Sequence, residues 1–455
     1  MHGLLTSLLL MTPTTAEAAE VTWGGYYRSR FRYFNSLSLS TENEFSEGSS
    51  WWADHRLRLR PTFILSNHVS LHSHVDVLPF VNWGQEPTDY ADLSAGTTDA
   101  AAYSQTVNPP TAEDGSAGTQ NLQVRSAFAE LTTDRVTASF GRMPTHWGSG
   151  MVWNAGGDPN SEYGDFADRV SLITSVGPVF LITAFETNAE QFVNESDDLK
   201  TAVGGVMWQG EKAGVGTYNT YRWQTFGEDN KFQLYTGDIW AEAQLGMSHF
   251  EFELAFQLGG GDLDESINDV RVTGLGTHLS ATLGGEKLSG GLAGGITTGD
   301  QDPFDTEFHA FSFDPDFNVA LMMFQEPMPV LTHENPHLQN NGGREYGAVR
   351  MGDRISNAMY LRPAIGYRFH DTLSADIAFI AAQATKVPER DKDERGYGAE
   401  IDLSLRYTPF EHFSLESTTG VYMPGKYVTK FKHDDLGGGF TETAIGSRLL
   451  ATVNF

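Results

Sequence analysis

Apolar and polar residues alternate one by one along much of this chain. In residues 250–258 every second position is apolar, and Glu251 and Glu253 fall between these positions. Residues 399–407 repeat the pattern, with Glu400 and Asp402 on the polar side. A helix would scatter these carboxylates around its circumference, whereas a strand places them all on one face. The alternation therefore predicts β-strands with one apolar and one polar face.

The connections between the predicted strands alternate between short and long. Counting the alternating segments gives about 18 strands, with about 16 as the alternative. Short turns are expected near Asn67, Asp134, Gly177, Glu211, Ser248, Glu286, Asp371 and Glu411. Longer polar connections are expected at residues 38–50, 85–119, 151–167, 187–198, 227–230, 260–268, 299–354, 388–395 and 424–441. The one around Glu228 to Asn230 is short enough to weaken the pattern locally. Short periplasmic turns and long extracellular loops are typical of an all-β, antiparallel, up-and-down transmembrane barrel, whereas a soluble sandwich has no reason for this alternation.

The first and last predicted strands are expected to pair with each other. In a lipid bilayer every backbone N–H and C=O group needs a partner, so a spanning sheet cannot keep a free edge. We expect residues 23–33 to pair with residues 443–455, and an even number of strands to place both termini on the periplasmic side. The last strand ends on Phe455, which resembles the C-terminal aromatic signal read by the outer-membrane assembly machinery.

Composition agrees with one membrane-embedded domain. Apolar residues make up 40% of the 455 positions, and no stretch reaches the roughly 18–20 consecutive apolar residues of a spanning helix. Glycine and aromatic residues are spread along the chain, and no linker rich in proline or serine divides it. We expect one barrel over residues 19–455, integral to the outer membrane of a Gram-negative cell and in contact with its lipid and lipopolysaccharide.

Residues 1–18 resemble a secretory signal peptide. Residues 4–11 are a short apolar run, and Ala16, Glu17 and Ala18 form the small-x-small pattern that signal peptidase cleaves. The usual Lys or Arg before the run is missing, with only His2 in its place. A disordered tail is the alternative interpretation.

Aromatic side chains near the predicted strand ends suit the girdles with which membrane barrels meet the lipid–water interface. The candidates are Tyr26, Trp51, Trp52, Trp147, Trp153 and Tyr422. Any single one of them can equally be ordinary packing, so the expectation applies to the group.

The polar faces of the first two predicted strands are dense in arginine. The residues are Arg28, Arg30, Arg32, Arg56, Arg58 and Arg60, with Asp54 at one end. If the two strands are adjacent, the guanidinium groups form a ladder at cross-strand spacing. Like charges so placed cost free energy unless water, acidic partners or a passing anion offsets them. We expect a pore-lining wall that attracts anions; the alternative is a wall balanced by nearby carboxylates, with no role in transport.

Acidic residues occupy the polar faces of strands near the middle of the sequence. They are Asp238, Glu242, Glu251 and Glu253. In a ring of about 18 strands they would line the pore roughly opposite the arginine wall. A basic wall facing an acidic wall gives a transverse field, which orients dipolar solutes and tunes charge selectivity.

The net charge of −29 excludes nucleic acid as a partner, because phosphate would be repelled. Much of the acidity falls in predicted outer loops, at Glu86, Asp89, Asp92, Glu113, Asp114, Asp197, Asp198, Asp262, Asp264, Asp391, Asp393, Glu394, Asp434 and Asp435. Solvated surface charge accounts for these residues. Divalent bridging to lipopolysaccharide is a possible addition that no ligand spacing supports.

No motif indicates catalysis, a cofactor or a metal site. The chain has no cysteine, which excludes thiol chemistry and Cys-ligated zinc. His68, His72 and His74 lie close together, but no companion ligand has a convincing spacing. No G-x-S-x-G motif supports a hydrolase, although a site assembled from distant residues would leave no short motif. We expect no enzyme activity, no cofactor and no bound metal.

The connection at residues 299–354 carries more apolar surface than a solvated loop needs. It contains the sequence Phe-Ser-Phe-Asp-Pro-Asp-Phe at 311–317 and an apolar run at 319–324. It can fold inward and constrict the lumen, or it can pack across the mouth. We favour the inward constriction as a hypothesis.

Residues 125–150 contain Arg-Ser-Ala-Phe-Ala-Glu-Leu, a short turn, and then Ser-Phe-Gly-Arg-Met-Pro-Thr-His-Trp-Gly-Ser-Gly. This resembles the paired strands with a Gly-Arg…Trp-Gly signature in alginate-export-like porins and related myxobacterial outer-membrane barrels. Residues 165–169, 314–316 and 355–360 resemble the same group. The resemblance implies a barrel of roughly 16–18 strands and, for alginate exporters, an arginine-lined lumen that passes an anionic polysaccharide. The six arginines fit that lining by residue type and face, whereas the acidic residues on the middle strands depart from it.

Two functional hypotheses follow. The leading one is a passive outer-membrane channel for small hydrophilic solutes with a weak preference for anions. The alternative is the exit pore of a polysaccharide secretion system, which requires a periplasmic partner and a gated lumen. Steady conductance of the bare protein favours the channel, whereas a closed barrel whose loss abolishes exopolysaccharide favours export.

Overall fold

The computed structural model describes residues 20–36, 39, 49–79, 83, 122–189, 199–226, 230–262, 269–301, 305–326, 354–387, 393–429 and 441–455. The expected signal peptide at residues 1–18 lies outside these ranges, as do residues 327–353 of the long connection. Among the described residues, no helix is both long and apolar enough to cross a membrane.

Strands dominate the described part of the chain. They are β1 (Glu20–Asn35), β2 (Ser49–Ser66), β3 (Val69–Val77), β4 (Leu122–Thr132), β5 (Val136–Pro144), β6 (Phe166–Val176), β7 (Val179–Ala189), β8 (Leu199–Gln209), β9 (Ala213–Phe226), β10 (Asn230–Leu245), β11 (Ser248–Gly261), β12 (Val270–Leu283), β13 (Leu288–Thr297), β14 (Glu307–Phe308), β15 (Ala358–His370), β16 (Leu373–Ala384), β17 (Gly396–Phe410), β18 (Phe413–Pro424) and β19 (Ala444–Asn454). One short helix, α3 (Lys426–Thr429), follows β18.

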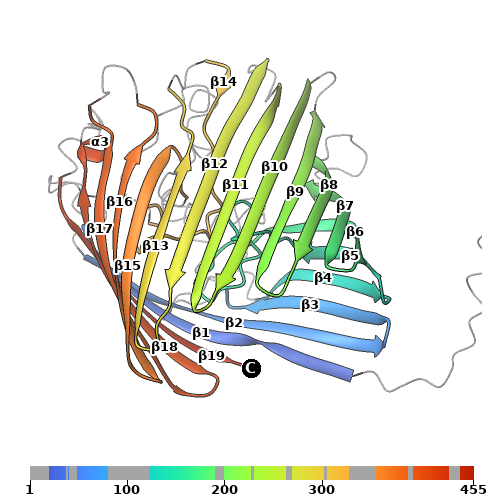
Figure 1. Cartoon of the computed structure of the whole chain (residues 1–455), viewed down its shortest axis with the longest axis horizontal. Coiled ribbons are helices and arrows are strands. Elements are labelled where there is room, and N and C mark those ends of the chain that lie inside the picture. The colour runs from blue at the N-terminus through green and yellow to red at the C-terminus, as the bar shows by residue number, and fades with distance from the viewer. Residues whose placement is uncertain are drawn as a thin grey trace, which may run out of the picture.

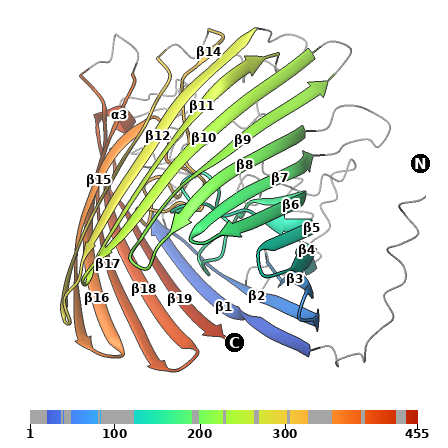
Figure 2. The ribbon, with the colours of Figure 1, turned by 45° about the vertical axis from the view of Figure 1, so that its right-hand side comes forward.

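Eighteen of these strands form one closed antiparallel ring (Figures 1 and 2). Each strand pairs with the next along the chain, except that β13 pairs with β15 across the long connection. At the seam, β1 pairs with β19, with Tyr26 opposite Asn454 and Asn35 opposite Ile445. The extra strand β14 pairs in parallel with β12 outside the ring. The expected barrel of about 18 strands and the pairing of its first and last strands are therefore confirmed.

Short turns and longer connections alternate along the chain, as expected. Turns of two to four residues follow β2, β4, β6, β8, β10, β12, β15 and β17. The connections after the other strands are longer, except that only three residues separate β9 from β10. They agree with the predicted ranges to within a few residues, although the expected ranges 85–119 and 151–167 begin earlier, after Val77 and Pro144. We refer to the two ends of the barrel as the short-turn rim and the long-loop rim.

The alternation of residue types decides which side chains face outward. On β11, Phe252 and Leu258 are exposed on the outer surface, whereas Glu253 is fully buried on the inner face. The same holds on β2, where Phe63 is exposed and Arg56 is buried. The barrel thus has an apolar exterior and places charged groups in its interior, which is the reverse of a soluble protein.

The expected aromatic girdle is wrong for most of its members. Of the six candidates, Trp51 is exposed on the outer face, whereas Tyr26, Trp147, Trp153 and Tyr422 are buried inside the barrel. Trp52 is half-buried and packs against the buried ring of Phe34, with the ring centroids 5.6 Å apart. Residue type near a strand end does not reveal the face, because a shift of one position reverses it.

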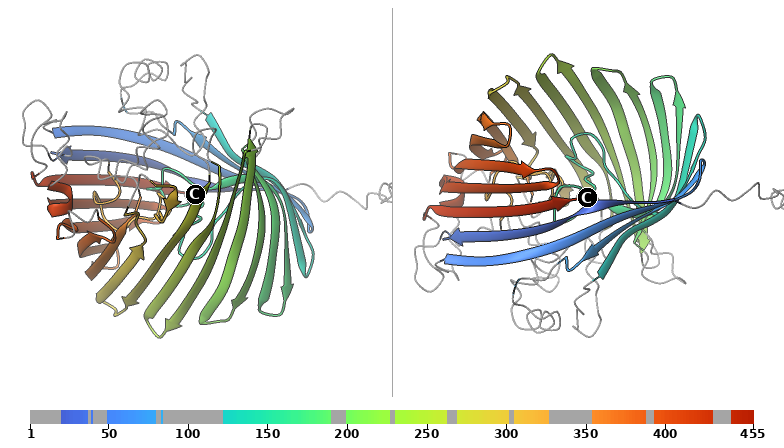
Figure 3. Two further views of the ribbon diagram at one scale, coloured as in Figure 1. Left: turned by 90° about the horizontal axis from the view of Figure 1, so that it is seen from above. Right: turned by 90° about the horizontal axis from the view of Figure 1, so that it is seen from below.

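Two connections run through the interior of the ring (Figure 3). The first inner loop, residues 145–165, joins β5 to β6, and its Met151 side chain is fully buried. The second inner loop, residues 311–326, lies between β14 and β15, and Phe311, Phe313 and Met322 in it are almost fully buried. Whether the second inner loop constricts a pore stays a prediction.

Glycines on the strands make room for both inner loops. A Cβ added at Gly216 on β9 would lie 2.7 Å from the ring of Trp147 in the first inner loop. A Cβ added at Gly276 on β12 would lie 2.6 Å from the ring of Phe311 in the second. Real Cβ atoms do not come that close to ring atoms, so a residue without a side chain at each position allows the loop to pack directly on the wall.

Candidate binding site in the barrel interior

The predicted arginine ladder forms between β1 and β2. Arg28 lies directly opposite Arg56, and Arg30 lies opposite Asp54. Both strands present these side chains to the interior, where Arg28, Arg30, Arg56 and Arg58 are at most 3% exposed. The adjacency expected from the sequence is present, and it brings guanidinium groups to cross-strand distance.

Carboxylates on β2 and β3 offset part of this charge. Asp54 accepts hydrogen bonds from Arg28 at 3.1 Å and from Arg30 at 2.9 Å. Asp76 on β3 accepts two hydrogen bonds from Arg58, at 2.8 and 2.9 Å. This bidentate geometry is the strong form of an arginine–carboxylate pair. The ladder therefore contains acidic partners, as the alternative interpretation required.

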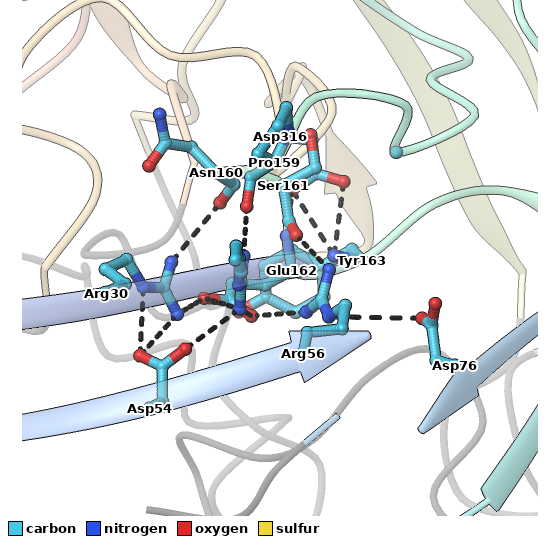
Figure 4. A network of polar contacts seen from close by, with 12 residues as sticks. Arg30, Asp54, Arg56, Asp76, Pro159, Asn160, Ser161, Glu162, Tyr163 and Asp316 are labelled. Atoms are coloured by element: carbon cyan, nitrogen blue, oxygen red, sulfur yellow. Dashed lines mark hydrogen bonds and ion pairs between the residues drawn. The ribbon is translucent and has the colours of Figure 1, made fainter. Parts of the chain in front are cut away.

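A further carboxylate reaches the ladder from the first inner loop (Figure 4). Glu162 pairs with Arg28 at 3.3 Å, with Arg32 at 2.6 Å and with Arg56 at 2.9 Å, and it also pairs with Arg30. Burial alone would raise the pKa of Glu162, but the four arginines hold that pKa well below its usual value. Four guanidinium groups from two strands thus converge on one carboxylate.

Backbone carbonyl groups of the first inner loop cover the rest of the ladder. Their pairings run in sequence order and are Gly156 with Arg58, Pro159 with Arg28, Asn160 with Arg30, Ser161 with Arg56, and Tyr163 with Arg125. Each carbonyl oxygen accepts a hydrogen bond from a guanidinium group. Residues 156–163 therefore present a series of carbonyl acceptors to the arginines, with a turn at residues 158–161.

Guanidinium groups outnumber carboxylates in this cluster. The arginine cluster consists of Arg28, Arg30, Arg32, Arg56, Arg58 and Arg125, and its carboxylate partners within 4.0 Å are Asp54, Asp76, Glu162 and Glu326. Six positive groups against four negative ones leave a surplus of two positive charges when all are ionised. The interior is therefore electropositive here even after internal pairing.

Sequence reasoning placed some members of this cluster and missed others. Arg60 lies on the same strand face but is exposed and outside the ion pairs described above. Arg125 on β4 belongs to the cluster although it was not predicted, and Arg448 on β19 lies opposite Arg32 across the seam. Each is an isolated arginine on its own strand, so nothing in the sequence pattern connects it with the ladder.

The predicted acidic residues hold the other end of the first inner loop. Asp238 accepts a hydrogen bond from the Trp147 indole N–H at 2.8 Å. Glu253 accepts hydrogen bonds from the backbone N–H and the hydroxyl of Ser149, both at 2.6 Å. Two predicted acidic residues thus anchor this loop.

The remaining two acidic residues accept hydrogen bonds from side chains on other strands. Glu242 accepts a hydrogen bond from the Gln209 amide at 3.1 Å, and Glu251 accepts one from the Trp240 indole at 3.0 Å. Within the ring of eighteen, β10 stands nine places from β1, and β11 nine places from β2. The first inner loop therefore bridges the interior from the acidic strands to the arginine cluster.

The second inner loop is joined to the first. Asp316 accepts hydrogen bonds from the backbone N–H groups of Glu162 at 2.8 Å and of Tyr163 at 3.1 Å. The backbone N–H of Asp314 donates to the carbonyl of Met151 at 2.7 Å. The first and second inner loops therefore form one hydrogen-bonded unit inside the barrel.

The second inner loop is also anchored on β17. The backbone N–H groups of Leu321, Met322 and Met323 donate to the carboxylates of Glu400 and Asp402 at 2.7–3.1 Å. Three consecutive N–H donors aimed at these two acidic side chains are a strong attachment, because hydrogen bonds are strengthened in a poorly solvated interior.

Buried carboxyl groups lie where the two inner loops meet. Burial raises the pKa of Asp165 to about 6. Burial, together with the charges of Asp165 and Asp316, raises the pKa of Asp314 well above its usual value. Burial also raises the pKa of Asp316. The contact between the loops therefore favours protonated carboxyl groups.

The histidines near the start of β3 make ordinary hydrogen bonds. His68 contacts the carbonyl of Thr132 at 2.9 Å, His72 contacts Ser70 at 2.8 Å, and His74 lies 3.3 Å from Asp76. Within the described ranges, no group of three or more His, Cys, Asp or Glu side chains is placed to hold a metal ion.

Replacing Trp147 by Phe should weaken the docking of the first inner loop. The ring packing would remain, but Asp238 would lose a buried hydrogen bond, at a cost of about 1–3 kcal/mol. We expect faster cleavage of residues 145–165 by a protease added to the detergent-solubilised protein. Trp51→Phe on the outer face is the matched control and should leave the cleavage rate unchanged.

No protein-family model matches this sequence, and no curated protein matches it. Solved structures do match. The chain resembles OccK9 (OpdG) of Pseudomonas aeruginosa, with a TM-score of 0.55 and 10% identity over 96% of this chain and 99% of that chain. It resembles OpdK of the same organism, solved with vanillate, with a TM-score of 0.52 and 11% identity over 95% and 98% of the two chains. It also resembles OccK2 (OpdF) of that organism, solved with glucuronate, with a TM-score of 0.52 and 9% identity over 96% and 98%.

These likenesses show a shared fold, that of outer-membrane porin barrels. They support the porin-like part of the resemblance drawn from the sequence. The alginate-export part stays a prediction, because at this level of identity a common fold says nothing of the substrate.

Proposed function

We propose that this protein is an outer-membrane channel for hydrophilic solutes with a preference for anions. The observation that carries the proposal is the arginine cluster, which lies on the inner face of a closed ring and keeps a positive surplus after internal pairing. An apolar exterior suits lipid, and an electropositive interior concentrates anions. Both OpdK and OccK2, which share the fold, were solved with carboxylate anions, vanillate and glucuronate.

The orientation follows from the same proposal. The short-turn rim would face the periplasm together with both termini, and the long-loop rim would face the outside and its lipopolysaccharide. Phe455 is 47% exposed at the end of β19 and would be available to the assembly machinery. A channel needs no catalytic group, which agrees with the expectation that the protein is not an enzyme.

Reconstitution into planar bilayers tests the proposal. Under a salt gradient, the reversal potential should report more chloride than potassium passing through the wild-type channel. The variant Arg56→Ala/Arg58→Ala/Arg60→Ala should lower the chloride-to-potassium permeability ratio by roughly tenfold, because three positive charges leave the interior. An unchanged chloride-to-potassium permeability ratio would show that these arginines do not determine the ion selectivity.

Two further variants make this measurement interpretable. Arg56 and Arg58 are buried in ion pairs, so removing them takes partners away from Glu162 and Asp76, at a cost of about 3–5 kcal/mol in stability. Arg60→Ala alone avoids that cost and should shift the ratio in the same direction by a smaller factor. Arg142→Ala removes an arginine paired with Asp168 on the outer face and should leave the ratio unchanged.

Export of an anionic polysaccharide is not favoured by any observation on the described residues. Steady conductance of the purified chain alone would argue against it, since an export pore requires a gate and a periplasmic partner.

A further inference from the structure

We infer that residues 156–163 are an internal ligand of the arginine cluster, and that Glu162 occupies a binding site for the carboxylate of a solute. The inference rests on the proposed function, because the competing carboxylate is a solute inside the channel. Beyond that function, it states that a carboxylate-binding site is already formed by the arginines and is occupied by Glu162. A solute must therefore displace Glu162 to bind.

The first reason is the origin of the carboxylate. Asp54 and Asp76 belong to strands β2 and β3 and stay beside the ladder wherever the barrel is folded. Glu162 comes from a connection, so its arrival at the ladder depends on how the first inner loop docks. A strand carboxylate is a fixed partner, whereas a loop carboxylate is one that a competitor can replace.

The second reason is the shape of the site. Arg28, Arg30, Arg32 and Arg56 present guanidinium groups to Glu162 from two strands, an arrangement that suits any carboxylate of similar size. The carbonyl groups from Gly156 to Tyr163 extend the row of acceptors beyond the carboxylate. The fitting solute is therefore a carboxylate that carries further oxygen acceptors, and a uronate sugar has this chemistry.

The third reason is access. The side chain of Glu162 is 29% exposed, whereas those of Arg28 and Arg56 are fully buried beneath it. Glu162 is thus the exposed member of the cluster and the first that an incoming anion meets.

Calorimetric titration of the full chain in detergent with D-glucuronate tests the site directly. Glucose is the uncharged comparison, because it has the same ring without the carboxylate. Wild type should bind glucuronate weakly and glucose not measurably. Glu162→Ala should bind glucuronate about tenfold more tightly or better, because the resident competitor is gone. Glu162→Gln keeps the shape and removes the charge, so its affinity should lie between these two.

Matched controls separate competition from a general change in the barrel. Glu211→Gln makes the same chemical change in an exposed turn on the short-turn rim and should bind glucuronate as wild type does. Adding Arg56→Ala to Glu162→Ala should abolish the gain in affinity. Equal affinity in wild type, Glu162→Ala and Glu162→Gln, or no binding in all three, would overturn the inference.

Conductance measured on the same proteins distinguishes this inference from the proposed function. If Glu162→Ala binds glucuronate more tightly but neither protein conducts ions, the site stands and the channel proposal fails. If both proteins conduct alike and bind glucuronate alike, the channel stands and the internal ligand is wrong.

Discussion

Replacing residues 310–353 by a short glycine–serine linker is expected to raise the single-channel conductance several-fold. The second inner loop contributes Phe311, Phe313, Met322 and other buried side chains to an apolar cluster inside the ring. Its removal would empty that volume and release the first inner loop from Asp316, which binds the backbone of Glu162 and Tyr163. The strands pair among themselves without this loop, so the ring should remain closed.

The control for this experiment is the integrity of the barrel. Circular dichroism should show unchanged strand content in the shortened protein. Glu400→Gln/Asp402→Asn is the milder companion variant, because it weakens the attachment of Leu321, Met322 and Met323 without deleting any residue. This variant should also raise the conductance, by a smaller factor than the deletion does. A folded, shortened barrel with unchanged conductance would show that the second inner loop does not constrict the pore.

Acidification from about pH 7.5 to about pH 5 is expected to lower the conductance, with a midpoint near pH 6. The pKa of Asp165 is raised to about 6 when the loops are docked, and those of Asp314 and Asp316 are raised as well. The docked state therefore holds protons that a separated state would release. This contribution to docking is complete below the ordinary pKa of an aspartate and is lost as the pH rises through the raised values.

The sign of this effect can be checked with amide variants. Asp165→Asn/Asp314→Asn keeps oxygen acceptors at both positions and removes the titration, so its conductance should change much less between these pH values. Each unit of pKa shift corresponds to about 1.4 kcal/mol, a factor of about ten, so the docking equilibrium should change by about tenfold or more between these pH values. A conductance that rises on acidification, or an equal pH dependence in the variant, would contradict the assignment to these carboxyl groups.

The strands and their order were predictable because the signal repeats. Each spanning segment alternates between apolar residues facing out and polar residues facing in, as Phe252 and Glu253 do, so the same pattern appears in almost every strand. Turn positions followed directly from the gaps between segments. The paths of the inner loops were not predictable in this way, because a connection has no period and its destination depends on contacts distant in sequence.

The sequence predicted the arginines of the candidate site but not the carboxylate Glu162 that they bind. Alternation placed Arg28 and Arg56 on inward faces, and their adjacency needed only the pairing of consecutive strands. Glu162 lies more than 100 positions from both arginines, and no local pattern connects it with them. A weaker signal was present, since Trp147, Met151 and Trp153 give this connection the same apolar excess that singled out residues 311–324. Applied to both connections, that argument would have predicted two inner loops.

The seam between β1 and β19 has a consequence for how the protein is made. Gly25 and Phe455 exchange two backbone hydrogen bonds, of 3.0 and 3.1 Å, across almost the full length of the sequence. Most other strand pairs join neighbours along the chain, so a curved sheet can grow strand by strand. The edge of β1 that pairs with β19 stays unpaired until β19 is added. Contacts of such long sequence separation form slowly, and during the wait the unpaired side of β1 is a template for another chain. A cell that makes this barrel therefore has to prevent the free edge of β1 from pairing with other chains until β19 is in place.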